Sequence, residues 1–440
     1  MICLNTSREC KESSETGDTT PGSRIYDRRF WLASISNFCT AVTVAILFRY
    51  ADLIERLGGG ELELGWIVGV GMSGSIVIRF ILGHTIDRHG ARRVWLVSLA
   101  VLATTCFAHL LLSSCHGLAI YALRILFVSS VAGVFGSSLT WVGSRVPRHR
   151  LAETIGALGA SGFVAWALGN FLGDLLSRGP YPIETLFIAA GLFAILAMGF
   201  CLGATAGYRA HVDPTHGSMV RLLWRHSSRV VLLVGVGTGL AIGLPGTFLR
   251  TFTAELGITT MGLFFAVYAA VALTVRISSR RFPERFGLAP VILLGLVLMC
   301  LGLLSFLLVK TTWQLAIPAA VLGCAHAIVF PPTIAASTLS FPEHCRGLGT
   351  MLILAAYDLG ILIGSPLSGA IIGYSGQYGL APYPTMFITI ASLLGLISLV
   401  FMVSFAFHRV PAVSREPASP VEPESHPKQP IALPECTPVR

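Results

Sequence analysis

The sequence predicts an all-α integral membrane protein with twelve transmembrane helices. Three features lead to this fold class: an apolar composition, apolar runs long enough to cross a bilayer, and basic residues concentrated between alternate runs. Of 440 residues, 54% are hydrophobic and 12% are charged, and the mean hydropathy is +0.74. So little polar surface cannot cover a soluble domain, and lipid is therefore the expected solvent for most of the chain.

The apolar runs define the elements. A spanning helix needs about 20 mostly apolar residues. A helix also satisfies its own backbone hydrogen bonds, as hydrocarbon requires. The predicted spans are 30–50, 64–83, 94–113, 117–142, 151–176, 184–205, 229–250, 259–279, 289–309, 312–336, 347–373 and 383–407.

The Lys and Arg residues predict the orientation of these spans. If both termini are cytoplasmic, the inside segments carry 15 of them and the outside segments carry 5. Cytoplasmic loops are where such residues accumulate, so we expect both termini inside. The formal charge of +9 lies mostly in these short gaps, which argues against a nucleic-acid partner.

Composition also divides the chain into five parts. We expect a polar N-terminal tail over 1–28, a six-helix bundle over 29–206, a cytoplasmic linker over 207–228, a second six-helix bundle over 229–408, and a disordered Pro-rich tail over 409–440. The first tail lacks the apolar stretch of a cleavable signal peptide, so the first span is expected to remain as an anchor.

The densest charge lies between the second and third spans, in GHTIDRHGARR, where six of eleven residues are ionisable. Gly83 would let the end of span 2 approach a neighbour, and Gly90 would supply a positive-φ turn. Asp87 is placed to bind a helix N-terminus or an arginine. The basic members mark the cytoplasmic side and can contact anionic lipid headgroups; they are Arg88, Arg92 and Arg93.

A second copy of this stretch indicates an internal duplication. VIRFILGHTIDRHGARRV aligns with TVRISSRRFPERFGLAPV at an offset of 197 residues. The matched pairs are Arg79 and Arg276, Asp87 and Glu284, Arg88 and Arg285, and Gly90 and Gly287. Later matches, such as Thr154 with Thr350, fall at an offset of 196. Two pseudo-symmetric six-helix halves are therefore expected. Arg280 replaces the first glycine, so the first copy is expected to matter more.

The pattern G-x-x-x-D-R-x-G-x-R-R between spans 2 and 3 of twelve, repeated weakly between spans 8 and 9, closely resembles the signature of the major facilitator superfamily. The resemblance covers residues 30–408. The phrases TVRISSRRFPERFG and CRGLGTMLILAAYDLGILIGSPLSG are similar to the bacterial exporter-like branch called arabinose-efflux permeases.

This resemblance implies a monomeric transporter in the bacterial cytoplasmic (inner) membrane, and export as its direction. It also implies that Asp87 docks one half against the other near the start of span 11. Arg145 and the segment starting near Arg346 are the candidate partners here.

Ionisable side chains inside spans usually face a cavity or a partner and mark function. They occur here at Arg79, Arg124, Asp174, Arg276, His326 and Asp358. Spans 3, 6, 9 and 12 have no Asp, Glu, Lys or Arg in their interiors, which agrees with the lipid-facing helices of the superfamily fold.

Six residues are candidates for the proton and substrate path. Asp358 lies near the middle of span 11 and could carry a proton or contact a cation. Arg124 of span 4 could bind an anion or counter Asp358; the resemblance suggests a part in proton relay, with Val128 where the family often has glycine. The others are His326, Asn37, Asn170 and Asp174.

Each of these others has a structural alternative. His326 precedes Pro331 and Pro332, where a broken helix is expected, or is a satisfied core residue. Asn37 could bind substrate or pair between helices. In GNFLGD, Asn170 and Asp174 replace a proline and a glycine of the antiporter signature, which weakens a drug–proton antiporter assignment. The glycine-rich span 7, with Pro245, is expected to be flexible or broken.

The predicted function is secondary active transport of a small organic solute by alternating access, proton-coupled and outward. The alternatives are a proton-coupled uptake symporter and a non-transporting sensor of the same fold. No Walker motif, GxSxG elbow or paired-histidine cluster occurs, so ATP drive and an enzyme are not expected. The ten cysteines form no CxxC pair, and neither a metal nor another cofactor is predicted.

Overall fold

The computed structural model describes residues 26–143, 145, 151–207, 228–279, 281–341 and 346–407. Most of the predicted N-terminal tail, the linker and the C-terminal tail lie outside these residues. Every regular element described is a helix. The first half contains α1 (Arg28–Ile46), η1 (Leu47–Arg49), α2 (Tyr50–Arg56), α3 (Glu61–His89), α4 (Ala91–Ala108), α5 (Leu118–Gly143), α6 (Leu151–Leu176) and α7 (Pro182–Ala204). The second contains α9 (Arg229–Glu255), α10 (Gly262–Ser278), α11 (Phe282–Phe286), α12 (Leu288–Ser305), α13 (Ala316–Leu339), α14 (Arg346–Ser375) and α15 (Pro382–Phe407).

These helices occupy all twelve predicted positions. Among the described residues, ten helices are long and apolar enough to cross a membrane. The other two predicted positions hold α6, with 26 residues, and the shorter apolar helix α10, with 17. The all-helical membrane fold predicted from composition is confirmed.

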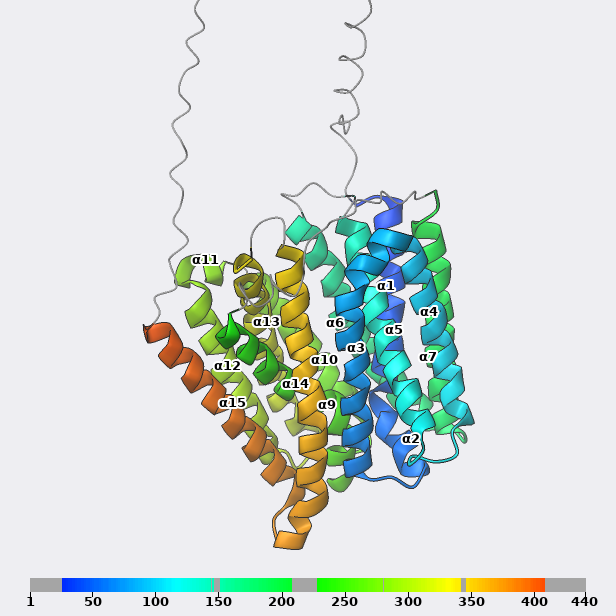
Figure 1. Cartoon of the computed structure of the whole chain (residues 1–440). Coiled ribbons are helices and arrows are strands. Elements are labelled where there is room, and N and C mark those ends of the chain that lie inside the picture. Colours follow the sequence, from blue (N-terminus) through cyan, green and yellow to red (C-terminus); the bar gives the residue numbers. More distant parts are fainter. Residues whose placement is uncertain are drawn as a thin grey trace, which may run out of the picture.

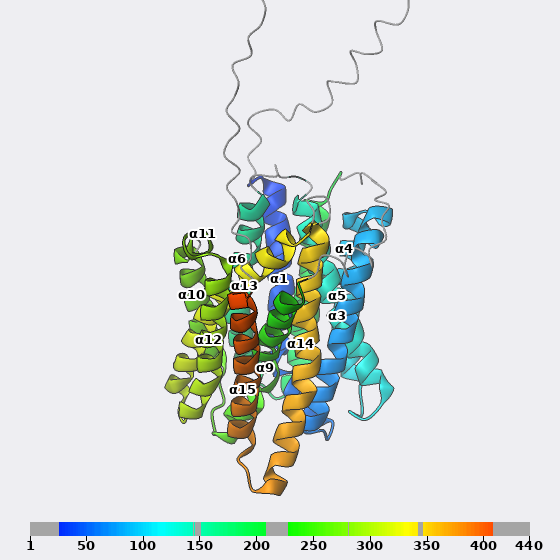
Figure 2. The ribbon, with the colours of Figure 1, turned by 60° about the vertical axis from the view of Figure 1, so that its left-hand side comes forward.

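The helices pack as two bundles that meet along two seams. Within the first bundle α1 contacts α6 and α7, and within the second α9 contacts α14 and α15. Between the bundles, α3 lies against α14, and α6 lies against α10. Figures 1 and 2 both show α3 and α14 side by side along most of their length. We call the membrane face that carries Gly90 and Gly287 the motif end, and the opposite face the far end.

The charged stretch after span 2 is mostly helical. Span 2 was predicted to end at residue 83, and the helix that forms it ends six residues later. Helix α3 continues through Asp87 and Arg88 to His89, and α4 begins at Ala91. Gly90 alone joins them, with φ +81° and ψ 144°. Gly287 joins α11 to α12 with φ +83° and ψ 163°. The duplicated motif therefore forms the same turn twice, and each turn uses a backbone conformation open essentially to glycine alone.

The helix expected to break at Pro331 and Pro332, and the one expected to be flexible or broken at Pro245, are both continuous. Helix α9 runs through Pro245, and α13 runs through Pro331 and Pro332. Beside the prolines of α13, the Thr333 hydroxyl donates to the Val329 carbonyl at 2.6 Å. Neighbouring helices and hydroxyl side chains can support a proline-containing helix in a membrane, which explains why the helix persists.

The glycines of α9 serve close packing instead. A Cβ added at Gly239 would lie 2.1 Å from the Tyr357 carbonyl oxygen of α14. Because Gly239 has no side chain, the backbones of α9 and α14 can approach closely there, as at small residues between other membrane helices.

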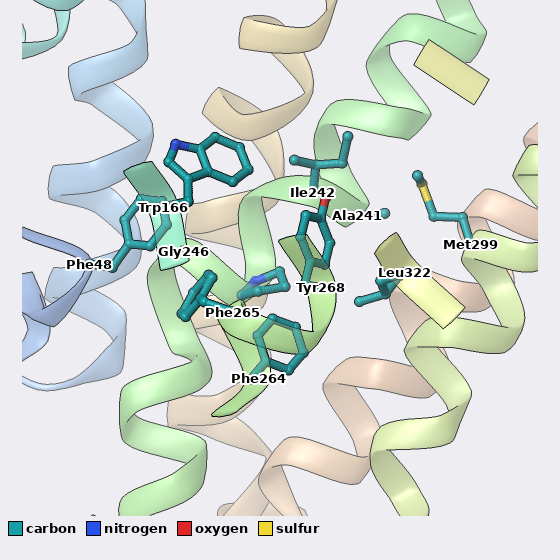
Figure 3. A pocket seen from close by; sticks show the side chains of 11 residues that line it. Phe48, Trp166, Ala241, Ile242, Gly246, Phe264, Phe265, Tyr268, Met299 and Leu322 are labelled. Atoms are coloured by element: carbon teal, nitrogen blue, oxygen red, sulfur yellow. The ribbon is translucent and has the colours of Figure 1, made fainter. Parts of the chain in front are cut away.

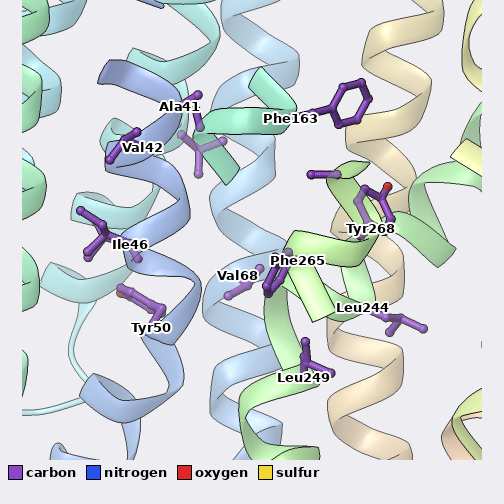
Figure 4. Packing of buried hydrophobic residues seen from close by; sticks show 14 of the residues in the cluster. Ala41, Val42, Ile46, Tyr50, Val68, Phe163, Leu244, Leu249, Phe265 and Tyr268 are labelled. Carbon is purple, nitrogen blue, oxygen red and sulfur yellow. The ribbon is translucent and has the colours of Figure 1, made fainter. Parts of the chain in front are cut away.

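One large cluster of buried apolar side chains extends through both bundles. In Figure 4, Ile46 of α1 and Val68 of α3 belong to the first half, and Phe265 and Tyr268 of α10 belong to the second. The two halves thus share a continuous core where the seams meet, which places any polar group there in an apolar setting.

Candidate transport pathway between the two halves

An ion pair joins the two halves inside the α3–α14 seam. Arg79 of α3 donates from Nε to Asp358 Oδ2 of α14 at 2.6 Å. Ser75 Oγ donates to the same oxygen, also at 2.6 Å. The Asp358 side chain is 8% exposed and that of Arg79 is 18% exposed. A buried carboxylate held by a cation and a hydroxyl is a group whose protonation would change the contact between the halves.

The pseudo-symmetric seam lacks this pair. Arg276, the repeat equivalent of Arg79, lies on α10 with its guanidinium carbon 5.9 Å from the centre of the Phe163 ring of α6. The position equivalent to Asp358 in the first half is Gly162. Among the described residues, the position equivalent to Asp358 at the α6–α10 seam therefore carries no carboxylate.

An apolar cavity of about 40 Å³ lies between the halves. Figure 3 shows Phe48 and Trp166 from the first half facing Tyr268 and Phe265 from the second. Other lining residues include Ile242, Phe264, Met299 and Leu322. Sites for organic ligands usually measure about 300–1,000 Å³, so this cavity is too small to hold such a ligand in the present conformation.

The polar group of this cavity is Tyr268, whose hydroxyl hydrogen-bonds His326 Nδ1 of α13. His326 is buried and also lies against Phe163 and Phe330. The bond joins α10 to α13 behind the aromatic lining. It offers one polar contact in an otherwise apolar site.

A network of four charges closes the far end. Arg49 donates to Asp52 and to Asp174, both at 2.9 Å. Asp52 also pairs with Arg250 of α9 at 2.9 Å. The four charges cancel, and Asp52 and Asp174 bring partners from both halves together.

Asp174 has a second role in this network. Its Oδ2 accepts hydrogen bonds from the backbone N–H groups of Met261 at 2.8 Å and Gly262 at 2.7 Å. A residue at the end of α6 therefore caps the N-terminus of α10, where a negative charge is favoured. Both seams are held at the far end, because Tyr383 of α15 also donates to Glu61 of α3 at 3.3 Å.

A cavity of about 380 Å³ lies beside this network. Its polar lining includes Glu55, Glu61, Arg250, Glu255 and Tyr383. No group of three or more His, Cys, Asp or Glu side chains suited to hold a metal occurs in the part of the chain that the structure describes.

The comparisons with known proteins agree with this geometry. A family model described as Major Facilitator Superfamily matches residues 30–283 and 231–435. The chain is a member of the major facilitator superfamily.

Curated relatives and solved structures support the same assignment. An uncharacterized MFS-type transporter of Salmonella typhimurium is 26% identical over 370 residues, covering 80% of this chain and 92% of the relative. The staphylopine export protein of Staphylococcus aureus is 22% identical over 362 residues, covering 77% and 88%. The crystal structure of the nucleoside transporter NupG aligns with a TM-score of 0.72 at 15% identity, covering 86% of this chain and 99% of that one, which shows the shared fold.

This MFS transporter brings only some of the predicted path residues together. Asp358 and His326 lie in the region between the halves, whereas Asp174 lies at the far end. Arg124 does not pair with Asp358. Its guanidinium carbon lies 4.4 Å from the centre of the Tyr50 ring, inside the first bundle.

The two predicted asparagines make contacts within the first bundle. Asn37 Nδ2 donates to Ser138 Oγ of α5 at 2.9 Å. Of its two predicted roles, substrate binding or pairing between helices, the structure shows the second. Asn170 Nδ2 donates to the Trp166 carbonyl one turn earlier at 2.9 Å. The neighbouring Gly169 packs on α1, where an added Cβ would lie 2.5 Å from that of Ala45.

The signature motif of the superfamily is only partly described. Arg88, Arg93 and Arg285 are exposed and Arg92 is partly buried at the motif end. The surroundings of Gly83 and the side chains of Asp87, Glu284 and Arg346 lie outside the described residues. Arg145 pairs with Asp27 at 2.9 Å and stacks on Trp141.

Sequence reasoning missed the far-end network and the aromatic lining. Arg49 and Arg250 were only counted among the five basic residues of the outside segments. Asp52, however, stands three residues after Arg49. That spacing is the one available signal for the network. Phe48, Trp166 and Tyr268 lie in ordinary apolar spans and carry no distinguishing pattern.

Proposed function

We propose that this MFS transporter is a proton-coupled exporter of a small apolar organic solute, working by alternating access. The Asp358–Arg79 ion pair across the α3–α14 seam carries the proposal. Protonation of Asp358 would remove one charge of the pair and release Arg79 from the opposite half. The seam would then be free to separate, which couples proton binding to the exchange of conformations.

The aromatic cavity is the proposed solute site. Both halves supply its walls, so rocking of one bundle against the other would enlarge it and open it to one side at a time. The lining contains no carboxylate, lysine or arginine. It therefore favours an uncharged or weakly polar solute.

The proposed orientation places the motif end in the cytoplasm, because basic residues are concentrated there. The far end would then face outward, and its contacts describe a conformation closed to the outside. The proposed location is the inner membrane of a bacterium, with the protein acting as a monomer. Outward transport is supported by the name of the staphylopine export protein and by resemblance to the arabinose-efflux branch.

A first experiment identifies a solute. Purified full-length protein is screened by thermal shift against sugars, amino acids and uncharged aromatic drugs. We expect the aromatic drugs to stabilise it and Trp166→Ala to weaken that effect. Stabilisation by sugars alone, unchanged in Trp166→Ala, would contradict the proposed site.

A second experiment tests coupling and direction together in proteoliposomes. A proton antiporter accumulates solute in vesicles with an acidic lumen, and a symporter accumulates it in vesicles with an acidic exterior. We expect accumulation with the acidic lumen. The reverse would establish the uptake symporter, and no movement under either gradient would favour the sensor.

Asp358→Asn separates coupling from solute passage. We expect it to lose accumulation driven by the pH gradient while solute exchange without a gradient continues. Glu184→Gln is the control, because the Arg56–Glu184 pair is exposed and lies within the first half. Undiminished gradient-driven accumulation in Asp358→Asn would overturn the role of this carboxylate.

A further inference from the structure

Three polar side chains that the proposed mechanism does not use gather inside the first bundle. Arg124 of α5 stacks on the ring of Tyr50, the first residue of α2. The ring of His109, at the end of α4, lies 5.7 Å from that of Tyr50, centre to centre. Phe127 and Phe187 complete the surroundings.

The polar atoms of this cluster are unsatisfied. Tyr50 is 3% exposed and His109 is 1% exposed. Tyr50 Oη, His109 Nε2 and Arg124 Nε are buried and have no hydrogen-bond partner among the described residues. Buried polar groups nearly always have partners, so three unpartnered atoms on neighbouring side chains suit the binding of a polar ligand.

The cluster also carries a charge without a counter-ion. None of the ion pairs between described residues involves Arg124. Two acids of the far-end network, Asp52 and Asp174, are already paired with Arg49 and Arg250. Stacking on an aromatic ring stabilises a guanidinium, but it does not neutralise it. The side chain of Arg124 is partly buried, and an anion beside it would compensate its charge.

We propose that Tyr50, His109 and Arg124 form a binding site for one compact monovalent anionic group, separate from the aromatic cavity. Arg124 supplies the charge and N–H donors, and the Tyr50 hydroxyl supplies another donor. His109 Nδ1 lies 2.6 Å from the Thr105 carbonyl and so carries a hydrogen. Its Nε2 then accepts a hydrogen from a water beside the anion.

The ligand could be a free inorganic anion or the carboxylate of a small organic acid. Both carry the single negative charge that would balance Arg124. The proposal concerns binding alone and holds whether or not the transport mechanism above is correct.

Thermal unfolding of the full-length protein in detergent tests the site directly. The protein is titrated with sodium chloride or sodium acetate against sodium gluconate at constant ionic strength, with gluconate serving as a bulky anion. A ligand that binds the folded state raises its stability in a saturable way. We expect chloride or acetate to raise the melting temperature above the gluconate value. Chloride alone would identify an inorganic anion, and acetate alone a carboxylate.

Variants assign the effect to this cluster. We expect Arg124→Gln to abolish the saturable response and Tyr50→Phe to weaken apparent affinity about tenfold, as loss of a hydrogen bond to a charged group implies. Arg56→Gln and Tyr378→Phe, at exposed positions, should respond like the wild type. If Arg124→Gln fails to fold, Tyr50→Phe decides the matter.

Two outcomes would overturn the proposal. One is a wild-type melting temperature that is equal in chloride, acetate and gluconate. The other is an unchanged response in Tyr50→Phe and in a folded Arg124→Gln.

Discussion

Asp174 at the end of α6 accepts hydrogen bonds from the backbone N–H groups of Met261 and Gly262 at the start of α10. One carboxylate of the first half therefore caps a helix of the second half. The same carboxylate pairs with Arg49 at 2.9 Å, which links the cap to the charge network of the far end. One side chain therefore contributes both an ion pair and a helix cap to the far-end contact between the halves.

Replacing Asp174 with Asn should loosen the far end. The amide keeps one acceptor oxygen but removes the charge that Arg49 and the helix terminus require. Each charged hydrogen bond weakened contributes about 1.5–3 kcal/mol. We expect a membrane-impermeant thiol reagent to modify Leu64→Cys, which lines the far-end cavity, at least about tenfold faster in this background.

The matched control for this measurement is Glu184→Gln, which removes an exposed ion pair within the first half. Variants without Leu64→Cys correct for labelling of the native cysteines. Equal labelling rates in the Asp174→Asn and control backgrounds would show that the network does not hold the far end closed.

The Arg79–Asp358 pair should show strong coupling in thermal stability. Removing one partner leaves the other charge buried, which costs about 3–5 kcal/mol, whereas removing both leaves no isolated charge. We expect Arg79→Gln and Asp358→Asn each to lower the melting temperature more than the double variant does. Additive losses in the double variant would mean that the two side chains do not interact energetically.

Gly65 should tolerate no side chain where α3 meets α14. An added Cβ would lie 2.4 Å from the Ser365 carbonyl oxygen, so the helices must separate to accept Gly65→Ala. We expect a lower melting temperature and faster modification of Leu64→Cys. Gly199→Ala on α7 is the control, because nothing lies within 4 Å of its added Cβ. Equal behaviour of the two variants would contradict the close contact.

The two motif turns should be equally sensitive to alanine. Gly90 and Gly287 have φ values of +81° and +83°, and a side chain there is strained by about 1–3 kcal/mol. We expect Gly90→Ala and Gly287→Ala to lower the melting temperature by similar amounts. Gly159→Ala, within α6 and free of close neighbours, should not do so. A loss at only one turn would indicate that the repeat differs in backbone conformation.

The sequence predicted the helices well because their signal is local. Apolar runs must be helical in lipid, and each of the twelve predicted ranges overlaps an observed helix. The positive-φ turn at Gly90 was also predicted, since a tight junction requires glycine there. The C-terminal end of α3 was not predicted. Its last residues are charged and give no hydropathy signal, and the helix continues through them until Gly90.

Contacts between distant helices were harder to predict. Arg124 and Asp358 were candidate partners by depth, yet Arg79 holds Asp358 and Arg124 turns toward Tyr50. Depth along a span follows from the residue number. The direction in which a side chain points depends on how each helix is rotated within its bundle, and the shape of all its neighbours sets that rotation.

By itself, the sequence determined the membrane location of the chain, its helices, its duplication and its family. These follow from properties that act along the chain: hydropathy over about 20 residues and repeated motifs. Only the tertiary structure decided that Arg79 pairs with Asp358, that Asp174 caps α10, and that aromatic residues from both halves enclose one cavity. Such contacts join residues far apart in the chain, and packing of complementary helix surfaces, rather than any local pattern, brings them together.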